Sequence, residues 1–158
     1  MGHLSRHKQE LPKARAFYDS IGNVDCPYFK TEVTFNAKGF HHLQFSAGSE
    51  RAKQAQLNKF ALLESVVEIL KHSGTVQQYR QQLGTVGHKK GKSGMYDTKM
   101  MTYWAFEGIL GAGPKMKRVK VIVRQIGDGK KHFWSVMSDT KFNRKSNYKL
   151  ATDDVIDG

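Results

Sequence analysis

The chain has 158 residues, of which 39% are hydrophobic and 11% aromatic, and this composition excludes an intrinsically disordered protein. The stretch from Met1 to Pro12 is too polar for a secretory signal, no apolar run approaches the roughly 20 residues that span a bilayer, and the single Cys26 excludes an internal disulfide. The formal net charge is +12. We expect a cytoplasmic protein with no membrane partner.

The first predicted element is a helix at Leu11–Ile21, where apolar residues recur at helical spacing. Pro12 suits the first turn of such a helix, because an N–H has no partner there, and Gly22 ends it. His3 and His7 precede this helix in a polar segment that we expect to fray. Residues 1–28 are thus predicted to form a helical extension.

The middle of the chain predicts a strand followed by two helices. Apolar positions alternate in the strand Phe29–Phe35, and Asn36 is a suitable N-cap for a short helix at Ala37–Leu43. Ser49 similarly caps a long helix at Glu50–Ser73, whose apolar face must pack against a sheet. That face consists of Leu57, Phe60, Leu63, Val67 and Leu70, widened by Leu62, Val66 and Ile69.

Strands dominate the second half. Lys99–Leu110, Val119–Ile126 and Lys131–Ser138 have the composition or the alternation of strands, and Gly127-Asp128-Gly129 is typical of a hairpin turn. The glycine- and lysine-rich stretch Thr85–Thr98 has no periodicity and predicts a mobile basic loop. The predicted fold is α+β, with N-terminal helices packed on one face of an antiparallel sheet of four to five strands.

Charge is distributed unevenly along the chain. Residues 75–150 hold 16 basic and 4 acidic residues, whereas residues 151–158 hold three Asp and no basic residue. We expect one α+β domain at residues 29–150 and an acidic tail at residues 151–158. Positive charge gathered in one half predicts a polyanionic partner, because Lys and Arg release counterions from phosphates.

The polar residues available for chemistry fit metal-free cleavage of RNA. Such cleavage needs a base for the 2′-hydroxyl proton, an acid for the leaving 5′ oxygen, and cations that stabilise the phosphorane. Histidine serves as acid or base near neutral pH, and arginine binds phosphate through paired N–H groups. No pattern of metal ligands accompanies them, so we expect neither a metal nor a cofactor. The candidates are His41, His42, His132, Glu107, Arg51, Arg80 and Arg124.

The order of these pieces resembles a known layout. A strand leads into Phe40-His41-His42-Leu43, Arg51 follows, and then come the Leu57–Leu70 helix, the strand Val119–Arg124 and His132-Phe133-Trp134-Ser135-Val136. Over roughly Glu32 to Asp139 this layout resembles the barnase–EndoU–colicin–RelE superfamily of ribonucleases and toxins, in particular its members from phages and mobile elements.

The resemblance implies a four- or five-stranded antiparallel sheet whose exposed face binds and cuts RNA. It also implies a catalytic group made of His42 with Arg51, Arg124, and His132 or Ser135, although sequence alone leaves open whether His41 or His42 acts. Lys120, Ile122 and Arg124 are predicted on the exposed face, because Val119, Val121 and Val123 must pack on the helix. Basic residues expected to contact RNA are Arg80, Lys89, Lys90, Lys92, Lys120, Arg144 and Lys145.

Two other interpretations stay open. In the first, the chain is a non-catalytic nucleic-acid-binding module. In the second, it is a basic subunit of a ribonucleoprotein or mobile-element complex. In the binding module, aromatic side chains would stack on bases while lysines follow the backbone. The candidates for this base stacking are Trp104, Phe106, Phe133 and Trp134.

The ribonuclease interpretation additionally requires a neutralising partner, which we expect to be an acidic antitoxin or immunity protein.

Overall fold

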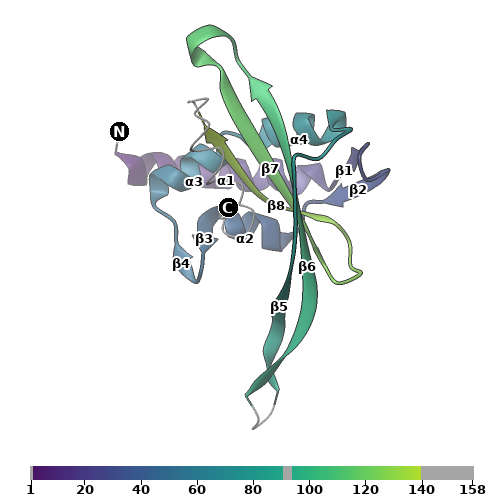
Figure 1. The fold of residues 1–158 in the computed structure, drawn as a ribbon. Coiled ribbons are helices and arrows are strands. Elements are labelled where there is room, and N and C mark those ends of the chain that lie inside the picture. Colours follow the sequence, from purple (N-terminus) through teal and green to yellow (C-terminus); the bar gives the residue numbers. More distant parts are fainter. Residues whose placement is uncertain (1, 91–93, 140–158) are drawn as a thin grey trace.

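A six-stranded sheet in the order β1-β2-β8-β7-β6-β5 lies at the centre of the structure, a computed structural model that describes residues 2–90 and 94–139 (Figure 1). Its strands are β1 (Asn23–Cys26), β2 (Thr31–Thr34), β5 (Gln78–Lys90), β6 (Met95–Leu110), β7 (Lys117–Ile126) and β8 (His132–Asp139). Neighbouring strands are antiparallel except β2 and β8, which run parallel and pair at Thr34 and His132. The fold is α+β as predicted, but the sheet is mixed and larger than the expected antiparallel sheet of four to five strands.

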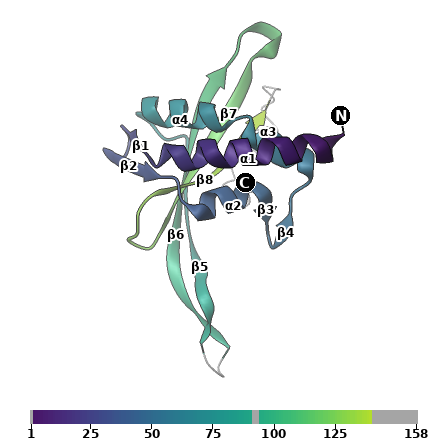
Figure 2. The same cartoon turned by 180° about the vertical axis from the view of Figure 1, so that it is seen from behind.

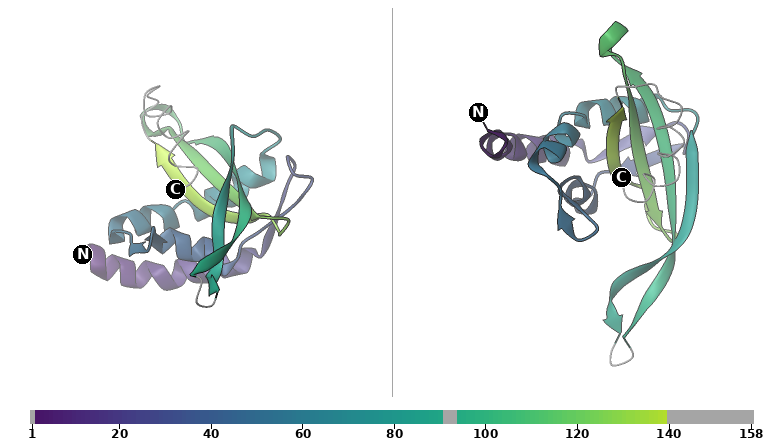
Figure 3. Two further views of the ribbon diagram at one scale, coloured as in Figure 1. Left: turned by 60° about the horizontal axis from the view of Figure 1, so that its bottom comes forward. Right: turned by 60° about the vertical axis from the view of Figure 1, so that its left-hand side comes forward.

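Helices cover one face of this sheet, in front of which they lie in Figure 2 and beside which they stand in the right-hand view of Figure 3. They are α1 (His3–Ile21), α2 (Ala37–Gln44), α3 (Lys53–Phe60) and α4 (Leu63–His72). Leu63 and Leu70 of α4 share one core with Val119, Val121 and Val123 of β7. The predicted contact between this face of β7 and the helical layer is therefore confirmed.

The first helix is longer than predicted. It begins at His3, so that Pro12 lies in its interior and removes a backbone hydrogen bond there. Contacts with α3 offset this cost: His7 is only 5% exposed, and its Nε2 lies 2.7 Å from the Gln56 Oε1. The prediction that this segment frays was wrong, because the stabilising contact is made to a residue far away in the sequence.

The N-terminal segment shares the core and the sheet of the rest of the fold. Tyr18 and Val24 are buried in the main core, and β1 pairs with β2 across the position where the boundary after residue 28 was expected. Cys26, at the end of β1, is 1% exposed. The predicted acidic tail at residues 151–158 lies outside the described residues. No helix within the described ranges is long and apolar enough to cross a lipid bilayer.

The long helix predicted at Glu50–Ser73 is two shorter helices. α3 ends at Phe60 and α4 begins at Leu63. Successive helical residues are about 100° apart, so on a continuous helix Leu57 would face almost opposite to Val66. The break between α3 and α4 changes the direction of the chain and allows both side chains to be buried in one core.

Helix α2 has the predicted cap and lies very close to β8. The Asn36 side chain accepts a hydrogen bond from the Gly39 N–H at 3.1 Å, which confirms the predicted start of the helix. A Cβ added to Gly39 would stand 2.5 Å from the carbonyl oxygen of Phe133 in β8. After α2, the hairpin formed by β3 (Phe45–Ser46) and β4 (Ser49–Glu50) occupies the place of the helix cap expected there.

The predicted mobile loop at Thr85–Thr98 is instead the far part of the β5–β6 hairpin. Thr85 pairs with Thr98, and Val86 pairs with Asp97. In Figure 1 this hairpin projects away from the rest of the sheet, and every residue from Asp97 to Met100 is exposed. The half-buried face of β5 carries Gln82 and Gly84 beside Val86, so it shows no apolar alternation, which explains why the sequence pattern missed this strand. The start of β6 was missed because its side chains from Asp97 to Met100 are exposed.

The second face of the sheet is not the open surface that the sequence predicts. Lys120, Ile122 and Arg124 do lie opposite the helix-facing valines, but they are 4%, 0% and 9% exposed. Ile122 belongs to a second core with Tyr103 of β6. Sequence alternation correctly identified the side of the strand that these residues occupy. It gave no information about the large neighbouring side chains that cover them, among them Trp134 and Met137.

Candidate functional site

The guanidinium of Arg124 is held by an imidazole on the next strand. Arg124 of β7 and His132 of β8 are direct register partners, and the Arg124 Nε donates to the His132 Nε2 at 3.0 Å. Burial, followed by the charge of Arg124, lowers the pKa of His132 to about 4. His132 is therefore uncharged at neutral pH, and its Nε2 accepts a hydrogen bond instead of releasing a proton.

A second arginine–histidine pair approaches from the helical layer. Arg51 precedes α3, and its Nε donates to the carbonyl oxygen of His42 at 3.0 Å. Its Nη2 lies 3.3 Å from the His42 Nε2. A guanidinium can only donate, so this contact requires an unprotonated Nε2 on His42. Arg51 is half-buried, and this burial lowers the pKa of its guanidinium.

Trp134 of β8 brings the two pairs together. The His42 ring stacks on it with 3.9 Å between ring centroids and 14° between planes, and the Arg124 Cζ lies 3.4 Å from its ring centroid. His132 approaches it edge-on at 6.3 Å. The structure thus brings together four of the seven predicted catalytic residues, namely His42, Arg51, Arg124 and His132. Trp134 was predicted only as a base-stacking residue, and its position two residues after His132 was the available signal for a place in this cluster.

A pocket of about 500 Å³ opens beside this cluster. Lys38 and His41 of α2 line it together with Arg124 and Trp134, and the residues from Thr85 to Gly87 of β5 form another wall. Lys38 and His41 are exposed, whereas His42 is buried. The His41 ring stacks on Phe45 at 4.6 Å. Of the two adjacent histidines, His41 is therefore the one that a molecule in the pocket can reach.

Glu107 and Ser135 lie apart from this pocket. Glu107 forms an ion pair with Arg118 at 3.6 Å and pairs in register with Lys120. It is four residues along β6 from Tyr103, the register partner of Arg124, which corresponds to about 13 Å along a strand. Ser135 is fully buried opposite Ile122. Neither residue lines the pocket.

Among the residues expected to contact RNA, Arg80 occupies an exposed position in the same row as Arg124. It pairs with Tyr103 of β6, which in turn pairs with Arg124, so the three share one face of the sheet. Tyr103 also forms a hydrogen bond with the Arg124 side chain. Lys120 is buried. The side chains of Lys89 and Lys90, and all of Lys92, Arg144 and Lys145, lie outside the described part of the structure.

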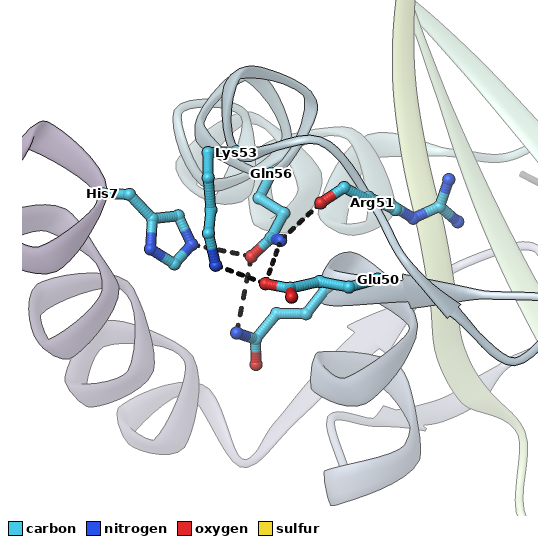
Figure 4. Close-up of polar contacts among 6 residues, drawn as sticks. His7, Glu50, Arg51, Lys53 and Gln56 are labelled. Carbon is cyan, nitrogen blue, oxygen red and sulfur yellow. Dashed lines mark hydrogen bonds and ion pairs between the residues drawn. The ribbon is translucent and has the colours of Figure 1, made fainter. Parts of the chain in front are cut away.

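A polar network around a buried glutamine lies behind Arg51, on the side of α1 (Figure 4). At its centre is Gln56 of α3, which is 0% exposed. His7 of α1 contacts the carboxamide from one side, and Glu50 contacts it from the other. Lys53 hydrogen-bonds Glu50 and, as the largest contribution, lowers the pKa of this carboxyl group. No feature of the sequence pattern had indicated this network, because its members come from separate elements.

Within residues 2–90 and 94–139, no group of three or more His, Cys, Asp or Glu side chains is placed to hold a metal ion. No protein-family model, curated protein sequence or solved structure matches the chain.

Proposed function

We propose that the chain is a metal-independent endoribonuclease whose reaction takes place in the pocket beside Trp134. The observation that carries this proposal is the position of Arg124. Its guanidinium is fixed by His132 and by the ring of Trp134, and it lines a pocket that also presents Lys38 and His41. A volume of about 500 Å³ is within the range of small-ligand sites and suits one nucleotide.

The side chains at this pocket match the requirements of RNA cleavage through the 2′-hydroxyl. His41 accepts the 2′-hydroxyl proton, the 2′ oxygen bonds to phosphorus, and the bond from phosphorus to the 5′ oxygen breaks. The leaving 5′ oxygen takes a proton from water at the open side of the pocket. Arg124 and Lys38 stabilise the negative charge on the phosphorane. The products are a 2′,3′-cyclic phosphate and a free 5′-hydroxyl.

His42 and His132 have a different role in this proposal from the one the resemblance implies. Each uses its Nε2 to accept a hydrogen bond from an arginine, and each is buried. His132 orients Arg124 toward the phosphate, while His42 supports the ring of Trp134 on which Arg124 lies. The proton-transfer role therefore passes to His41.

The test is incubation of purified protein with total RNA at low salt, with and without EDTA. We expect fragments in both samples, ending in 2′,3′-cyclic phosphate. His41→Ala and Arg124→Ala should each lower the cleavage rate by about 100-fold or more. His72→Ala is the matched control, because His72 is an exposed histidine of α4 that pairs only with Glu68 among the ion pairs described. An inactive wild-type protein, or full activity of both site variants, would refute the proposal.

The same assay separates the alternatives. RNA binding without cleavage would favour a non-catalytic module, and binding only within a larger particle would favour a ribonucleoprotein or mobile-element subunit. The main core contains Trp104, Phe106 and Phe133, which are 8%, 0% and 0% exposed. Base stacking by these three residues is therefore not supported. Trp134 is the member of this group that lines the pocket.

A cytoplasmic location and an acidic neutralising protein belong to the same proposal. Burial raises the pKa of the Cys26 thiol, and a poorly reactive free thiol is compatible with a reducing compartment. An acidic antitoxin or immunity protein would protect the host by covering the cationic pocket. A pulldown from host extract with the His41→Ala variant, which keeps Lys38 and Arg124, should recover an acidic protein, and recovery of none would count against such a partner.

A further inference from the structure

The carboxamide of Gln56 uses all of its hydrogen-bonding capacity inside the protein. Its Oε1 accepts from the His7 Nε2 at 2.7 Å and from the Gln44 Nε2 at 3.4 Å. Its Nε2 donates to the Glu50 Oε1 at 3.2 Å and to the Arg51 carbonyl oxygen at 2.8 Å. A carboxamide has two donors and two acceptor positions, so this one has a single orientation.

That orientation fixes the backbone from which the Arg51 side chain starts. Gln56 holds the Arg51 carbonyl, and the Arg51 N–H donates to the Gln44 carbonyl oxygen at 2.8 Å. Figure 4 shows the Arg51 side chain pointing away from this network. Its guanidinium then contacts His42, which stacks on Trp134. A continuous series of contacts thus links Gln56 to the pocket.

We propose that Gln56 is a positioning residue of the candidate site. It sets the position of Arg51, and through Arg51 that of His42 against Trp134. His7 of α1 fixes the carboxamide, because its Nε2–H donates to an oxygen that can only accept. The N-terminal helix is therefore a supporting part of the pocket. The effect on cleavage rests on the proposed function, whereas the effect on Trp134 does not.

The experiment compares the two indole N–H resonances of the protein by NMR, assigned with Trp134→Phe. Gln56→Met keeps the length of the side chain but removes all four hydrogen bonds. His7→Phe keeps a ring near Phe60 but has no N–H, and His7→Gln restores a donor. Gln54→Leu is the matched control, because the Gln54 side chain bonds Asn58 on the exposed side of the same helix.

We expect Gln56→Met and His7→Phe to shift the Trp134 resonance and to leave the Trp104 resonance in place. His7→Gln should restore the wild-type position, and Gln54→Leu should not change it. In the cleavage assay the first two variants should lower kcat by up to about 100-fold, since small displacements of reacting groups have effects of this size.

An unchanged Trp134 resonance in either folded variant would overturn the assignment, and so would equal shifts of both indole signals. If Gln56→Met does not fold, the pair His7→Phe and His7→Gln decides the question. Failure of the proposed function gives a different result: the wild-type protein does not cleave RNA, while the NMR shifts still report on the link between Gln56 and Trp134.

Discussion

Gly39 of α2 contacts β8 so closely that a Cβ would stand 2.5 Å from the carbonyl oxygen of Phe133. This contact sets the distance between α2, which carries His41 and His42, and the strand that carries Trp134. A side chain at position 39 must displace one of the two elements, because a strand carbonyl cannot rotate away from the helix.

The first prediction therefore concerns Gly39→Ala. We expect it to lower the free energy of unfolding by about 1–3 kcal/mol, which is the usual cost of overpacking a filled interior. Urea unfolding measures this change. Gly74→Ala is the matched control, because a Cβ at Gly74 meets nothing within 4 Å. Equal stability of the two variants would show that α2 can move away from β8 at no cost.

The second prediction concerns the main core. Leu63 is 1% exposed and Phe60 is 9% exposed, and each packs into the core on its own side of the break between α3 and α4. Leu63→Ala and Phe60→Ala should each lower the free energy of unfolding by about 2–5 kcal/mol, since both leave cavities. Leu4→Ala is the control, because Leu4 is 68% exposed. Unchanged thermal midpoints for the core variants would contradict the packing described.

The third prediction is a pH dependence of stability from His132. Its pKa is about 4 in the folded protein and 6.5 for an ordinary histidine. Between these values the unfolded chain binds a proton that the folded protein does not, so stability falls as the pH is lowered from about 6.5 to about 4. The total loss from this group is about 3 kcal/mol, at 1.36 kcal/mol per pKa unit.

Urea unfolding at several pH values in this window measures the effect. His132→Gln should flatten the pH dependence between pH 4 and 6.5, because glutamine does not titrate. His72→Gln should leave it unchanged, since His72 is exposed on α4. A wild-type slope in the His132→Gln variant would mean that folding does not lower the pKa of His132.

The fourth prediction concerns salt. If the chain binds RNA through its cationic residues, the logarithm of the association constant falls linearly with the logarithm of salt concentration, with a slope of about −0.7 per phosphate contact for single strands. Filter binding at about 50 to 300 mM salt measures the slope. Arg80→Ala should reduce its magnitude, whereas Arg6→Ala on α1 should not. An affinity that does not depend on salt would show that these charges do not contact phosphate.

Local signals predicted part of this fold well. The Asn36 cap and the turn at Gly127, with its positive φ of 54°, depend on a few adjacent residues. The alternation in β7 identified its helix-facing side because the three central residues of that side, Val119, Val121 and Val123, are all valine. The same reasoning could not predict that Lys120 is buried, since its covering neighbours come from other strands.

The candidate site shows the same division. His42, Arg51, Arg124 and His132 were recognisable by residue type, and the order of elements indicated that they lie near one another. Their roles depend on burial and partners, which residue type does not record: His132 is uncharged because it is enclosed beside Arg124. Glu107 was a plausible base by chemistry alone, yet the register of β6 places it with Arg118.

The pocket draws its side chains from two separate halves of the chain. Lys38 and His41 come from the first half, whereas Arg124 comes from β7 and Trp134 from β8. During synthesis on the ribosome the N-terminal helices emerge first, without the strands that complete the pocket. The site therefore forms only after Trp134 has been added, and a nascent or truncated chain that ends before β8 carries none of it in assembled form.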